Sequence, residues 1–365
     1  MGHIRPFADD DVAAVARLHQ KVFKTCCGDR AGAESYHAYF RRVFFDNPSR
    51  DEALPSLVYE ERGGAIVGFL GVVPRRMSLN GQPVVAAIST QFVVEPSTHT
   101  ALVAVQLART FLNGPQDLSI SDEANDVSRK IWERLGGTTA LVQSLYWTRA
   151  LRPAQFALSF LRERRRLAPI ASLAGPAARL IDAVATRCRS SQFFQPASDD
   201  TQDSRTFDNV PSGLRDLAHA GVLHPEYDES TFLWLIQRAR QRKAGSRLYA
   251  AVLGSGAPAG WYLYSLDSTR TADVLHIAAT PSSVHHVLGH LFQHAWAQGA
   301  VAANGRVEPR FLQAFADAYC VLHRRGPWML VNARRPELVR SFQAGDASFS
   351  RLDGEWCLGF QGTAS

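Results

Sequence analysis

Two adjacent acidic residues, Asp122 and Glu123, follow the segment DLSIS, which has the composition of a short buried strand. The next segment, EANDVSRKIWERLGG, predicts a helix that ends at Gly136 and Gly137. A carboxylate that is ionised near neutral pH can take a proton from an ammonium group, directly or through water. The alternative is that both acids only stabilise the start of the helix, where the helix dipole favours negative charge.

A second candidate site lies in VVEPSTHTALVAVQLARTFLNG, residues 93–114, which predicts a strand, a short polar turn and a long helix. The first turn of a helix offers unpaired N–H groups and the positive end of the dipole, a combination that binds phosphate. Loops that cradle phosphates usually contain glycine, and residues 97–102 contain none. The turn is therefore either a phosphate-binding loop without its glycine or an ordinary connection between strand and helix.

Three histidines, His286, His290 and His294, are spaced four residues apart in a predicted helix and therefore share one face. Imidazoles at this spacing can share a metal ion. The HExxH pattern is absent from the sequence, and no cluster of cysteine or aspartate accompanies the histidines. We expect a polar face that meets solvent or a cleft, and no metal site.

The 365-residue chain is 46% hydrophobic and 20% charged, which is typical of a soluble globular protein of about two domains. No apolar run reaches the ~18 residues that a membrane helix needs, and the N-terminus lacks the apolar core of a signal peptide. The five cysteines form no CxxC pair, which favours free thiols in a reducing compartment. These features predict a cytoplasmic protein.

The net charge of +6 is concentrated in residues 149–189, which hold nine arginines, no lysine and two acids. The rest of the chain is close to neutral, so the basic composition does not indicate a nucleic-acid-binding protein. The arginines stand among bulky apolar residues, as in FALSFLRERRRLAP, and such a helix could contact an anionic membrane surface. The alternative is a helix packed between domains with its arginines in water.

Strand and helix signals alternate along residues 1–150, give way to an arginine-rich helical segment over 151–204, and return over 205–365. In both outer segments an apolar strand ends at a proline, a helix follows and ends at a glycine, and a short strand, a helix and a tryptophan-containing strand come next. The two stretches run from Pro96 to Gly114 and from Pro281 to Gly299. We interpret the chain as two diverged copies of one α/β unit with mixed, mostly antiparallel sheets, joined by a basic helical linker.

The first copy resembles the GNAT superfamily of acyltransferases. The donor loop of that family reads, after a strand and a proline, Arg/Gln-x-x-Gly-x-Gly/Ala, and the corresponding frame here is HTALVA, residues 99–104. A later helix of the family reads Asn-x-x-Ala-x-x-x-Tyr-x-x-x-Gly, and the frame here is NDVSRKIWERLG, residues 125–136. The resemblance covers residues 1–150 and rests more on element order than on motif letters. Two such units in one chain look like bacterial tandem GNAT proteins.

The resemblance implies an N-acyltransferase that uses acetyl-CoA or another acyl-CoA and a primary amine, on a small molecule such as a sugar, as acceptor. The amine would attack the thioester directly while a backbone N–H of residues 92–94 polarises the carbonyl. Asp122 and Glu123 would then lie at the amine cleft as candidate bases. The implied donor-binding residues are Phe92, Val93 and Val94 on the strand, His99, Thr100, Ala101, Leu102, Val103 and Ala104 at the helix start, and Asn125 and Trp132 on the later helix.

Several positions depart from the pattern of the family. Leu102 replaces a glycine of the donor loop, although backbone N–H groups do the binding. Trp132 stands where a tyrosine usually protonates the departing thiolate, and an indole cannot act as that acid. Asn125 is either a donor contact or a residue that begins the helix. The alternative to an enzyme is thus a catalytically silent GNAT-like binding protein, and a Fem-like aminoacyl transferase is disfavoured because no helical arm is evident.

The second copy departs further from the family. Val284 and Val287 stand where the donor loop carries Arg/Gln and glycine. We therefore expect no CoA binding in the second copy.

Overall fold

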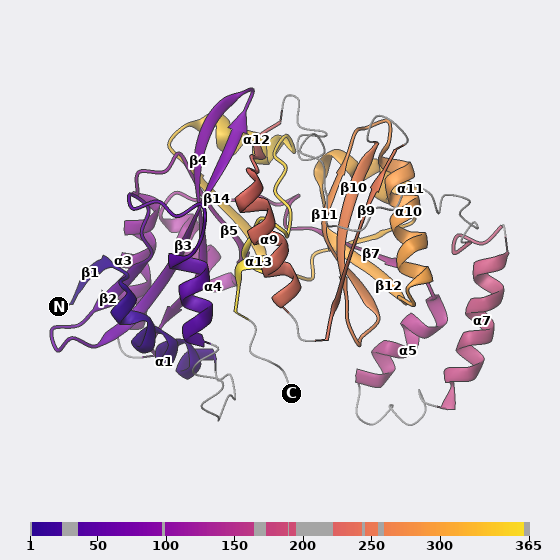
Figure 1. The fold of residues 1–365 in the computed structure, drawn as a ribbon, viewed down its shortest axis with the longest axis horizontal. Coiled ribbons are helices and arrows are strands. Elements are labelled where there is room, and N and C mark those ends of the chain that lie inside the picture. The colour runs from indigo at the N-terminus through magenta and orange to yellow at the C-terminus, as the bar shows by residue number, and fades with distance from the viewer. Residues whose placement is uncertain are drawn as a thin grey trace. The chain divides into compact units, whose positions relative to one another are not determined.

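The computed structural model describes residues 2–23, 36–96, 99–163, 173–188, 190–194, 222–242, 245–254 and 259–360. The chain forms two compact units, each with its own sheet (Figure 1). Unit 1 comprises residues 1–144, 219–244 and 326–365, and unit 2 comprises residues 145–218 and 245–325. None of the helices within the described ranges has the length and apolar character needed to cross a membrane.

Unit 1 is built on a sheet with the strand order β1-β2-β3-β4-β5-β14-β6, and β8 pairs with β3. The strands are β1 (His3–Pro6), β2 (Leu57–Glu60), β3 (Ile66–Leu79), β4 (Gln82–Val94), β5 (Leu118–Ala124), β6 (Thr138–Thr139), β8 (His224–Pro225) and β14 (Trp328–Ala333). β4 and β5 pair in parallel, and the other neighbours pair antiparallel. The expected mixed, mostly antiparallel sheet is confirmed.

The two hairpins of unit 1 turn at residues that accept a left-handed backbone. Asn80 and Gly81 join β3 to β4 with φ angles of 54° and 76°, the left-handed backbone of a tight hairpin turn. Gly64, with φ 79°, lies in the turn between β2 and β3. Both turns therefore use residue types that tolerate positive φ.

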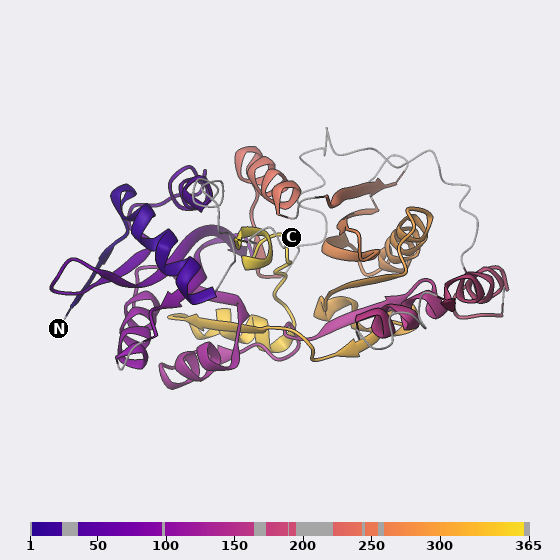
Figure 2. The same cartoon turned by 90° about the horizontal axis from the view of Figure 1, so that it is seen from below.

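Helices cover both faces of the unit 1 sheet (Figure 2). α1 (Val12–Phe23) packs on one face, over an aromatic cluster of Phe7, Phe40, Phe44 and Phe69. α3 (Thr100–Leu112) and α4 (Asp126–Arg134) pack on the other. The remaining helices are η1 (Asp9–Asp11), η2 (Arg41–Phe45), α9 (Glu229–Gln241), α12 (Pro336–Ala344) and α13 (Glu355–Leu358).

α3 lies very close to β3 at Gly68. A Cβ atom at Gly68 would lie 2.8 Å from Cδ1 of Leu107 and 2.9 Å from Cγ1 of Val103. A larger residue at this position would force the side chains of Leu107 and Val103 to shift, so Gly68 allows α3 to pack closely on the sheet.

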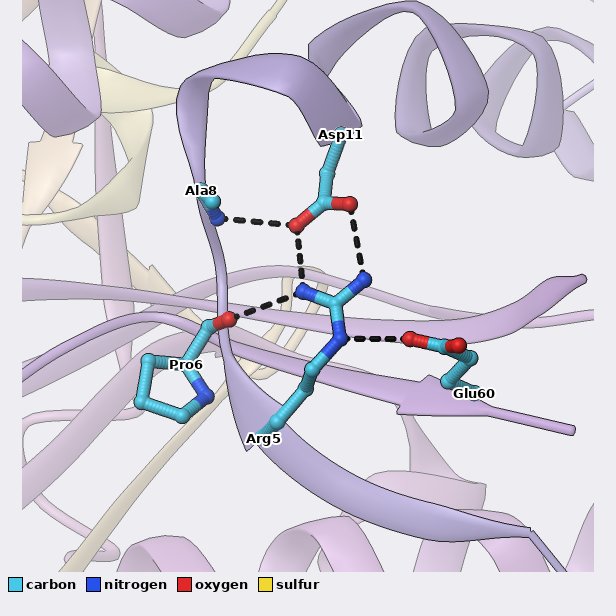
Figure 3. Close-up of polar contacts among 5 residues, drawn as sticks. All are labelled: Arg5, Pro6, Ala8, Asp11 and Glu60. Atoms are coloured by element: carbon cyan, nitrogen blue, oxygen red, sulfur yellow. Dashed lines mark hydrogen bonds and ion pairs between the residues drawn. The ribbon is translucent and has the colours of Figure 1, made fainter. Parts of the chain in front are cut away.

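Arg5 ties the first strand to its surroundings (Figure 3). Its guanidinium group donates to both carboxylate oxygens of Asp11, at 2.6 and 2.8 Å, and its Nε donates to Glu60 on β2 at 2.5 Å. Asp11 also accepts the N–H of Ala8 at 2.8 Å. The hydrogen bonds from Arg5 hold the pKa of Asp11 below its usual range, so this corner is stable at neutral pH and loses this contribution as Asp11 becomes protonated in acid.

Unit 2 is built on a sheet with the strand order β13-β7-β12-β11-β10-β9. β11 and β12 pair in parallel, and the others pair antiparallel. The strands are β7 (Tyr146–Ala150), β9 (Arg247–Leu253), β10 (Gly260–Leu266), β11 (Thr271–Ala279), β12 (Ala302–Arg306) and β13 (Val321–His323). The helices are α5 (Pro153–Glu163), α7 (Gly175–Arg187), α10 (Val284–Ala297), η3 (Pro309–Phe311) and α11 (Leu312–Asp317).

The compact units differ from the contiguous division at residues 150 and 205 that we expected. β7, from the end of the first segment, joins the sheet of unit 2, whereas β14 and α9, from the last segment, belong to unit 1. α5 and α7 pack together within unit 2 and are not a separate linker. Hydrophobic periodicity identifies a strand but does not say which sheet edge it joins, because pairing depends on distant residues.

The two units nevertheless share one order of elements. Each has a parallel strand pair connected by a helix, β4-α3-β5 in unit 1 and β11-α10-β12 in unit 2. An antiparallel strand flanks each pair, β14 or β7, and the next helix begins at a proline, Pro336 or Pro153. A diverged internal repeat accounts for this order, and the repeat itself stays a prediction.

Candidate functional site

The two parallel strands of unit 1 separate partway along their length. β4 and β5 pair only from Ala86 to Ile88 and from Leu118 to Ile120. Beyond these residues each strand continues, to Val94 and to Ala124, without further pairing between the two, and every residue involved is described. Beyond this point the facing edges of the two strands are no longer paired with each other.

A bulge in β4 accompanies the separation. Val93 pairs with Phe69 but Thr90 pairs with Gly71, so β4 has one residue more than β3 in this stretch. Gln91 adopts φ 51°, which is rare for a residue with a side chain inside a strand. Strained backbone of this kind concentrates at functional sites.

A pocket of about 420 Å³ lies where the strands separate. Segments from across unit 1 contribute to its lining, which includes the bulge, the end of β5, the start of α4 and the C-terminal segment. The lining residues are His19, Phe23, Ser89, Thr90, Gln91, Phe92, Ser121, Glu123, Ala124, Asn125, Ser128, Trp132, Arg242, Glu355, Gly359 and Phe360.

Glu355 is the carboxylate most firmly fixed in this pocket. Its Oε1 accepts the backbone N–H of Gln91 at 2.7 Å, the hydroxyl of Thr90 at 3.0 Å and the side-chain amide of Gln91 at 3.3 Å. Burial raises the pKa of Glu355 to about 8, and the nearby Asp122 and Glu123 act in the same direction. A carboxylate with a pKa near neutral pH is suited to proton transfer.

The segment that carries Glu355 differs from the prediction. The pattern SRLDGEWCLGF predicts a turn followed by a strand, but the structure has the short helix α13, which begins at Glu355. The turn at Asp353 and Gly354 is present, yet the residues after it have no strand partner in the described sheets. Alternation over so few residues cannot distinguish a strand from one helical turn.

Asp122 on β5 holds the backbone of Glu355 in place. Asp122 is completely buried and accepts the backbone N–H of Glu355 at 2.7 Å. Gly354 lies directly on this carboxylate, and any Cβ at position 354 would overlap it. Asp122 therefore positions the C-terminal segment and does not line the pocket, whereas Glu123 does.

Both acids lie within β5 and not beyond it, so they do not act as helix-start acids. The start of α4 is capped by Asn125, whose side chain accepts the N–H of Ser128 at 2.9 Å. Asn125 has this structural role and also lines the pocket. The sequence places the end of this strand too early, because β5 continues through the polar residues Asp122 and Glu123. Asp122 is buried there against the segment that carries Glu355.

His19 continues the series of hydrogen-bonded side chains that runs from Glu355 through Gln91. Its Nε2 lies 2.5 Å from Oε1 of Gln91, and burial lowers the pKa of His19 to about 4. The imidazole is therefore neutral at pH 7, and because an amide oxygen only accepts, Nε2 carries the proton. His19 thus orients the amide of Gln91, whose NH₂ group faces Glu355.

Arg242, at the end of α9, secures α13 from another direction. It donates to the backbone carbonyl of Glu355 at 3.1 Å and lies over the ring of Trp356 at 4.2 Å. Burial lowers the pKa of Arg242 to about 10, so it remains charged. The sequence does not identify four residues of this site: His19, Gln91, Arg242 and Glu355. They come from distant segments of the chain. The one local signal is at Gln91, a polar residue in an apolar run.

The expected donor loop lies at the start of α3. Thr100 donates its hydroxyl to the carbonyl of Glu95 at 2.8 Å, and Leu102 is 45% exposed. Val103 and Ala104 are buried against the sheet, and His99 and Ala101 are exposed. Ser97 and Thr98, which precede them, lie outside the described residues.

The other expected donor residues lie on the strand and on α4. Val93 is buried, while Phe92 and Val94 are half-buried and Phe92 lines the pocket. Trp132 is 1% exposed and packs against Phe111, with ring centroids 5.9 Å apart. Its indole therefore belongs mainly to the core between α3 and α4, and Trp132 also lines the pocket.

The corresponding region of unit 2 is differently equipped. Val284 and Val287 of α10 are buried, and hydroxyl groups of Thr280 and Ser283 bond to each other and to the neighbouring backbone. His290 and His294 make hydrogen bonds to the hydroxyls of Tyr262 and Tyr264, at 3.0 and 2.8 Å. The histidine face thus meets two tyrosines of the sheet, and His286 is exposed.

No protein-family model and no curated protein sequence matches this chain. Solved structures do match it. A GCN5-related N-acetyltransferase from Anabaena variabilis ATCC 29413 is 10% identical, with 90% of this chain and 72% of that chain covered and a TM-score of 0.54. A conserved protein of unknown function from Enterococcus faecalis V583, described as a probable N-acyltransferase, is 9% identical, with coverage of 94% and 74% and a TM-score of 0.56.

The chain therefore shares the fold of these two solved structures, one of them a GCN5-related N-acetyltransferase. This confirms the fold class expected from the resemblance, including two sheets that fit two GNAT-like units. At these identities the likeness concerns the GNAT fold alone. The chemistry must therefore be argued from the residues of the pocket.

Proposed function

We propose that unit 1 transfers an acyl group from an acyl-CoA to a primary amine of a small molecule. The observation that carries this proposal is the gap between β4 and β5, with Glu355 held at its edge by the bulge at Gln91. The gap offers open strand edges for an extended donor, and the pocket offers carboxylates for a cationic acceptor. The GNAT fold supports the same class of reaction.

The donor would lie along β4 with its pyrophosphate at the first turn of α3. The N–H of Glu95 donates to the carbonyl of Val67 at 2.8 Å, on the β3 side. Because successive N–H groups of a strand point in opposite directions, the N–H of Val94 is directed toward the gap. This N–H would polarise the thioester carbonyl and stabilise the oxyanion that forms there.

Glu355 would act as the base. Its ionised form accepts a proton from the acceptor ammonium, directly or through water, and the free amine then attacks the thioester carbon. The carbon–sulfur bond breaks and CoA leaves as a thiolate that takes a proton from water, since Trp132 has no acid to offer. Glu123, the other carboxylate of the pocket, would attract the cationic acceptor.

Substitutions at Leu102 separate a donor site from a plain turn. Leu102→Glu places an acid in the first turn of α3, where the dipole should stabilise the helix by about 0.3–1 kcal/mol. The same charge should repel the pyrophosphate and weaken CoA binding by about tenfold, or ~1.4 kcal/mol. Leu102→Gly should keep or tighten CoA binding despite a helix cost of up to ~1 kcal/mol. Calorimetric CoA titrations beside thermal melts measure both properties.

Leu141→Glu is the matched control, because Leu141 is exposed on unit 1 but lies outside the pocket. A Leu102→Glu variant that binds CoA as tightly as this control would contradict the donor site at α3. If the unsubstituted protein binds no CoA at millimolar concentration, the catalytically silent binding protein becomes the better account.

We also propose that the arginine-rich region contacts anionic membrane surfaces. Residues 164–172 and Arg189 of this region lie outside the described residues, but α7 is described and has an unusual distribution of side chains. It buries Asp182 and Thr186 and exposes Leu180, Ile181 and Val184, which are 71%, 58% and 71% exposed. Apolar residues on the outside of a helix that also carries arginines suit an anionic lipid surface.

Vesicle co-sedimentation tests this contact. The protein should bind vesicles that contain anionic lipid, less so at high salt, and Leu180→Ser with Val184→Ser should reduce binding severalfold. Val127→Ser on α4 is the control, because Val127 is equally exposed in unit 1. Equal binding to neutral vesicles, or none to either kind, would eliminate the idea.

We place the protein in the cytoplasm. Three described cysteines are free thiols, which fits a reducing compartment: Cys188, Cys320 and Cys357. The proposed reaction also requires a compartment that contains acyl-CoA.

A further inference from the structure

A second pocket, of about 740 Å³, lies entirely within unit 2 and plays no part in the proposed acyl transfer. It is formed by α5, α7, the end of α10 and the residue that precedes β11. The charged and aromatic groups that define it are Arg152, Arg179, Asp182, Arg187, Arg270 and Trp296.

Positive charge predominates in this pocket. Four guanidinium groups face a single carboxylate, Asp182. Asp182 is already occupied, because it accepts the N–H groups of Ala154 and Gln155 at 2.8 and 3.1 Å and the side-chain amide of Gln155 at 2.9 Å. These bonds place its single negative charge at the positive end of α5, and one carboxylate against four guanidinium groups leaves the pocket with an excess of positive charge.

Two of the arginines are held rigidly. Arg152 donates to the carbonyls of Trp296, at 2.9 Å, and Ala300, and lies over the Trp296 ring at 4.9 Å. Arg270 donates to the carbonyl of Gly299 at 2.8 Å and to the side chain of Gln155 at 2.9 Å. Burial lowers the pKa of Arg152, and the neighbouring charge of Arg270 lowers that pKa further, so the two groups repel each other. An anion between them would relieve this repulsion.

The other two arginines are exposed and unengaged. Arg179 lies one turn before Asp182 on α7, Arg187 is the last residue of the helix, and both line the pocket. Neither has a hydrogen-bond or ion-pair partner within the ranges that the structure describes. They can therefore turn toward a bound ligand without losing an existing contact.

We propose that this pocket binds a ligand through phosphate groups that carry several negative charges, such as a pyrophosphate or a phosphomonoester. Guanidinium groups match phosphate oxygens with two parallel hydrogen bonds, which favours phosphate over smaller anions. The excess of guanidinium over carboxylate groups calls for a multiply charged ligand. The phosphate could belong to a soluble molecule or to a lipid headgroup, and the experiment distinguishes these sources.

Inorganic pyrophosphate is the first probe. It should bind the full-length protein in calorimetry and raise its melting temperature. The double variant Arg179→Gln, Arg187→Gln should bind at least about tenfold more weakly at this site, as expected for the loss of two charge-assisted contacts. The control Arg247→Gln removes an exposed arginine of unit 2 that lies outside the pocket and should bind like the unsubstituted protein. Melting without ligand should be alike for all three, because the substituted side chains are exposed.

Vesicles provide the second arm. Competition between pyrophosphate and vesicles containing phosphatidic acid, absent with phosphatidylcholine alone, would support a headgroup source. Pyrophosphate binding without such competition would support a soluble phosphate ligand. No pyrophosphate binding to the unsubstituted protein, or binding that the double variant retains in full, overturns the proposal. The second result would place any anion elsewhere, including at α3.

Discussion

Replacing Glu355 with glutamine should lower kcat for amine acylation by about 10²–10⁴-fold while CoA binding is kept. The variant preserves the size of the side chain and an oxygen that can accept from Gln91 and Thr90. It removes only the group that takes the proton. Release of free CoA from acetyl-CoA, with a panel of small primary amines, measures the loss. A variant that acylates as fast as the unsubstituted protein would exclude Glu355 as the base.

The pH dependence of unfolding stability, compared between the unsubstituted protein and Glu355→Gln, gives a readout that needs no acceptor. The pKa of Glu355 is raised from 4.5 to about 8, so between these values the native state holds a proton that the unfolded state has lost. The unsubstituted protein should therefore lose stability as pH rises from 5 to 9, relative to the variant, by roughly 4 kcal/mol. Its acylation rate should rise through pH 8 as the base ionises. Denaturant unfolding at pH 5 and pH 9 measures this. The same difference in unfolding free energy between the two proteins at both pH values would contradict the expectation.

Adding one methyl group at Gly354 should disable the same site by disturbing the contact between Asp122 and α13. A Cβ at this position overlaps the carboxylate of Asp122, which is completely buried and cannot retreat into solvent. Gly354→Ala should therefore displace α13 or separate Asp122 from the N–H of Glu355, with a loss of about 2–4 kcal/mol in stability. Activity should fall as far as in Glu355→Gln, because the base is no longer in place. CoA binding at α3 should be retained.

Gly63→Ala is the control for Gly354→Ala. Gly63 lies in a hairpin turn of the same unit, and a Cβ there meets nothing within 4 Å. Denaturant unfolding and CoA release on both variants make the comparison. If Gly354→Ala were as stable and active as Gly63→Ala, the C-terminal segment would not rest on Asp122.

The elements that position the pocket were predictable where the signal is local. Asn80 and Gly81 fix a hairpin by their backbone preferences, and the strand, turn and helix of residues 93–114 follow from apolar periodicity. The GNAT fold followed from the order of these elements. The division into units did not, because the choice of β14 over β7 as the neighbour of β5 depends on pairing between residues about 200 positions apart, as for Leu330 and Ser121.

The composition of the site was predictable only in part. Glu123, Phe92, Asn125 and Trp132 were identified from their places in the resemblance, and all four line the pocket. Glu355 was missed because nothing near it in the sequence shows that Asp122 and the bulge lie beside it. The bulge itself is a long-range feature, since the count of residues in β4 matters only relative to β3.

A crystal structure of the protein with acetyl-CoA tests the central claim most directly. The account predicts density with the thioester in the gap between β4 and β5, its carbonyl oxygen near the N–H of Val94, and the pyrophosphate at the first turn of α3. It predicts no CoA at the start of α10, where Val284 and Val287 are buried and Thr280 and Ser283 occupy the turn. CoA bound at α10 in place of α3, or no density at millimolar acetyl-CoA, would contradict it.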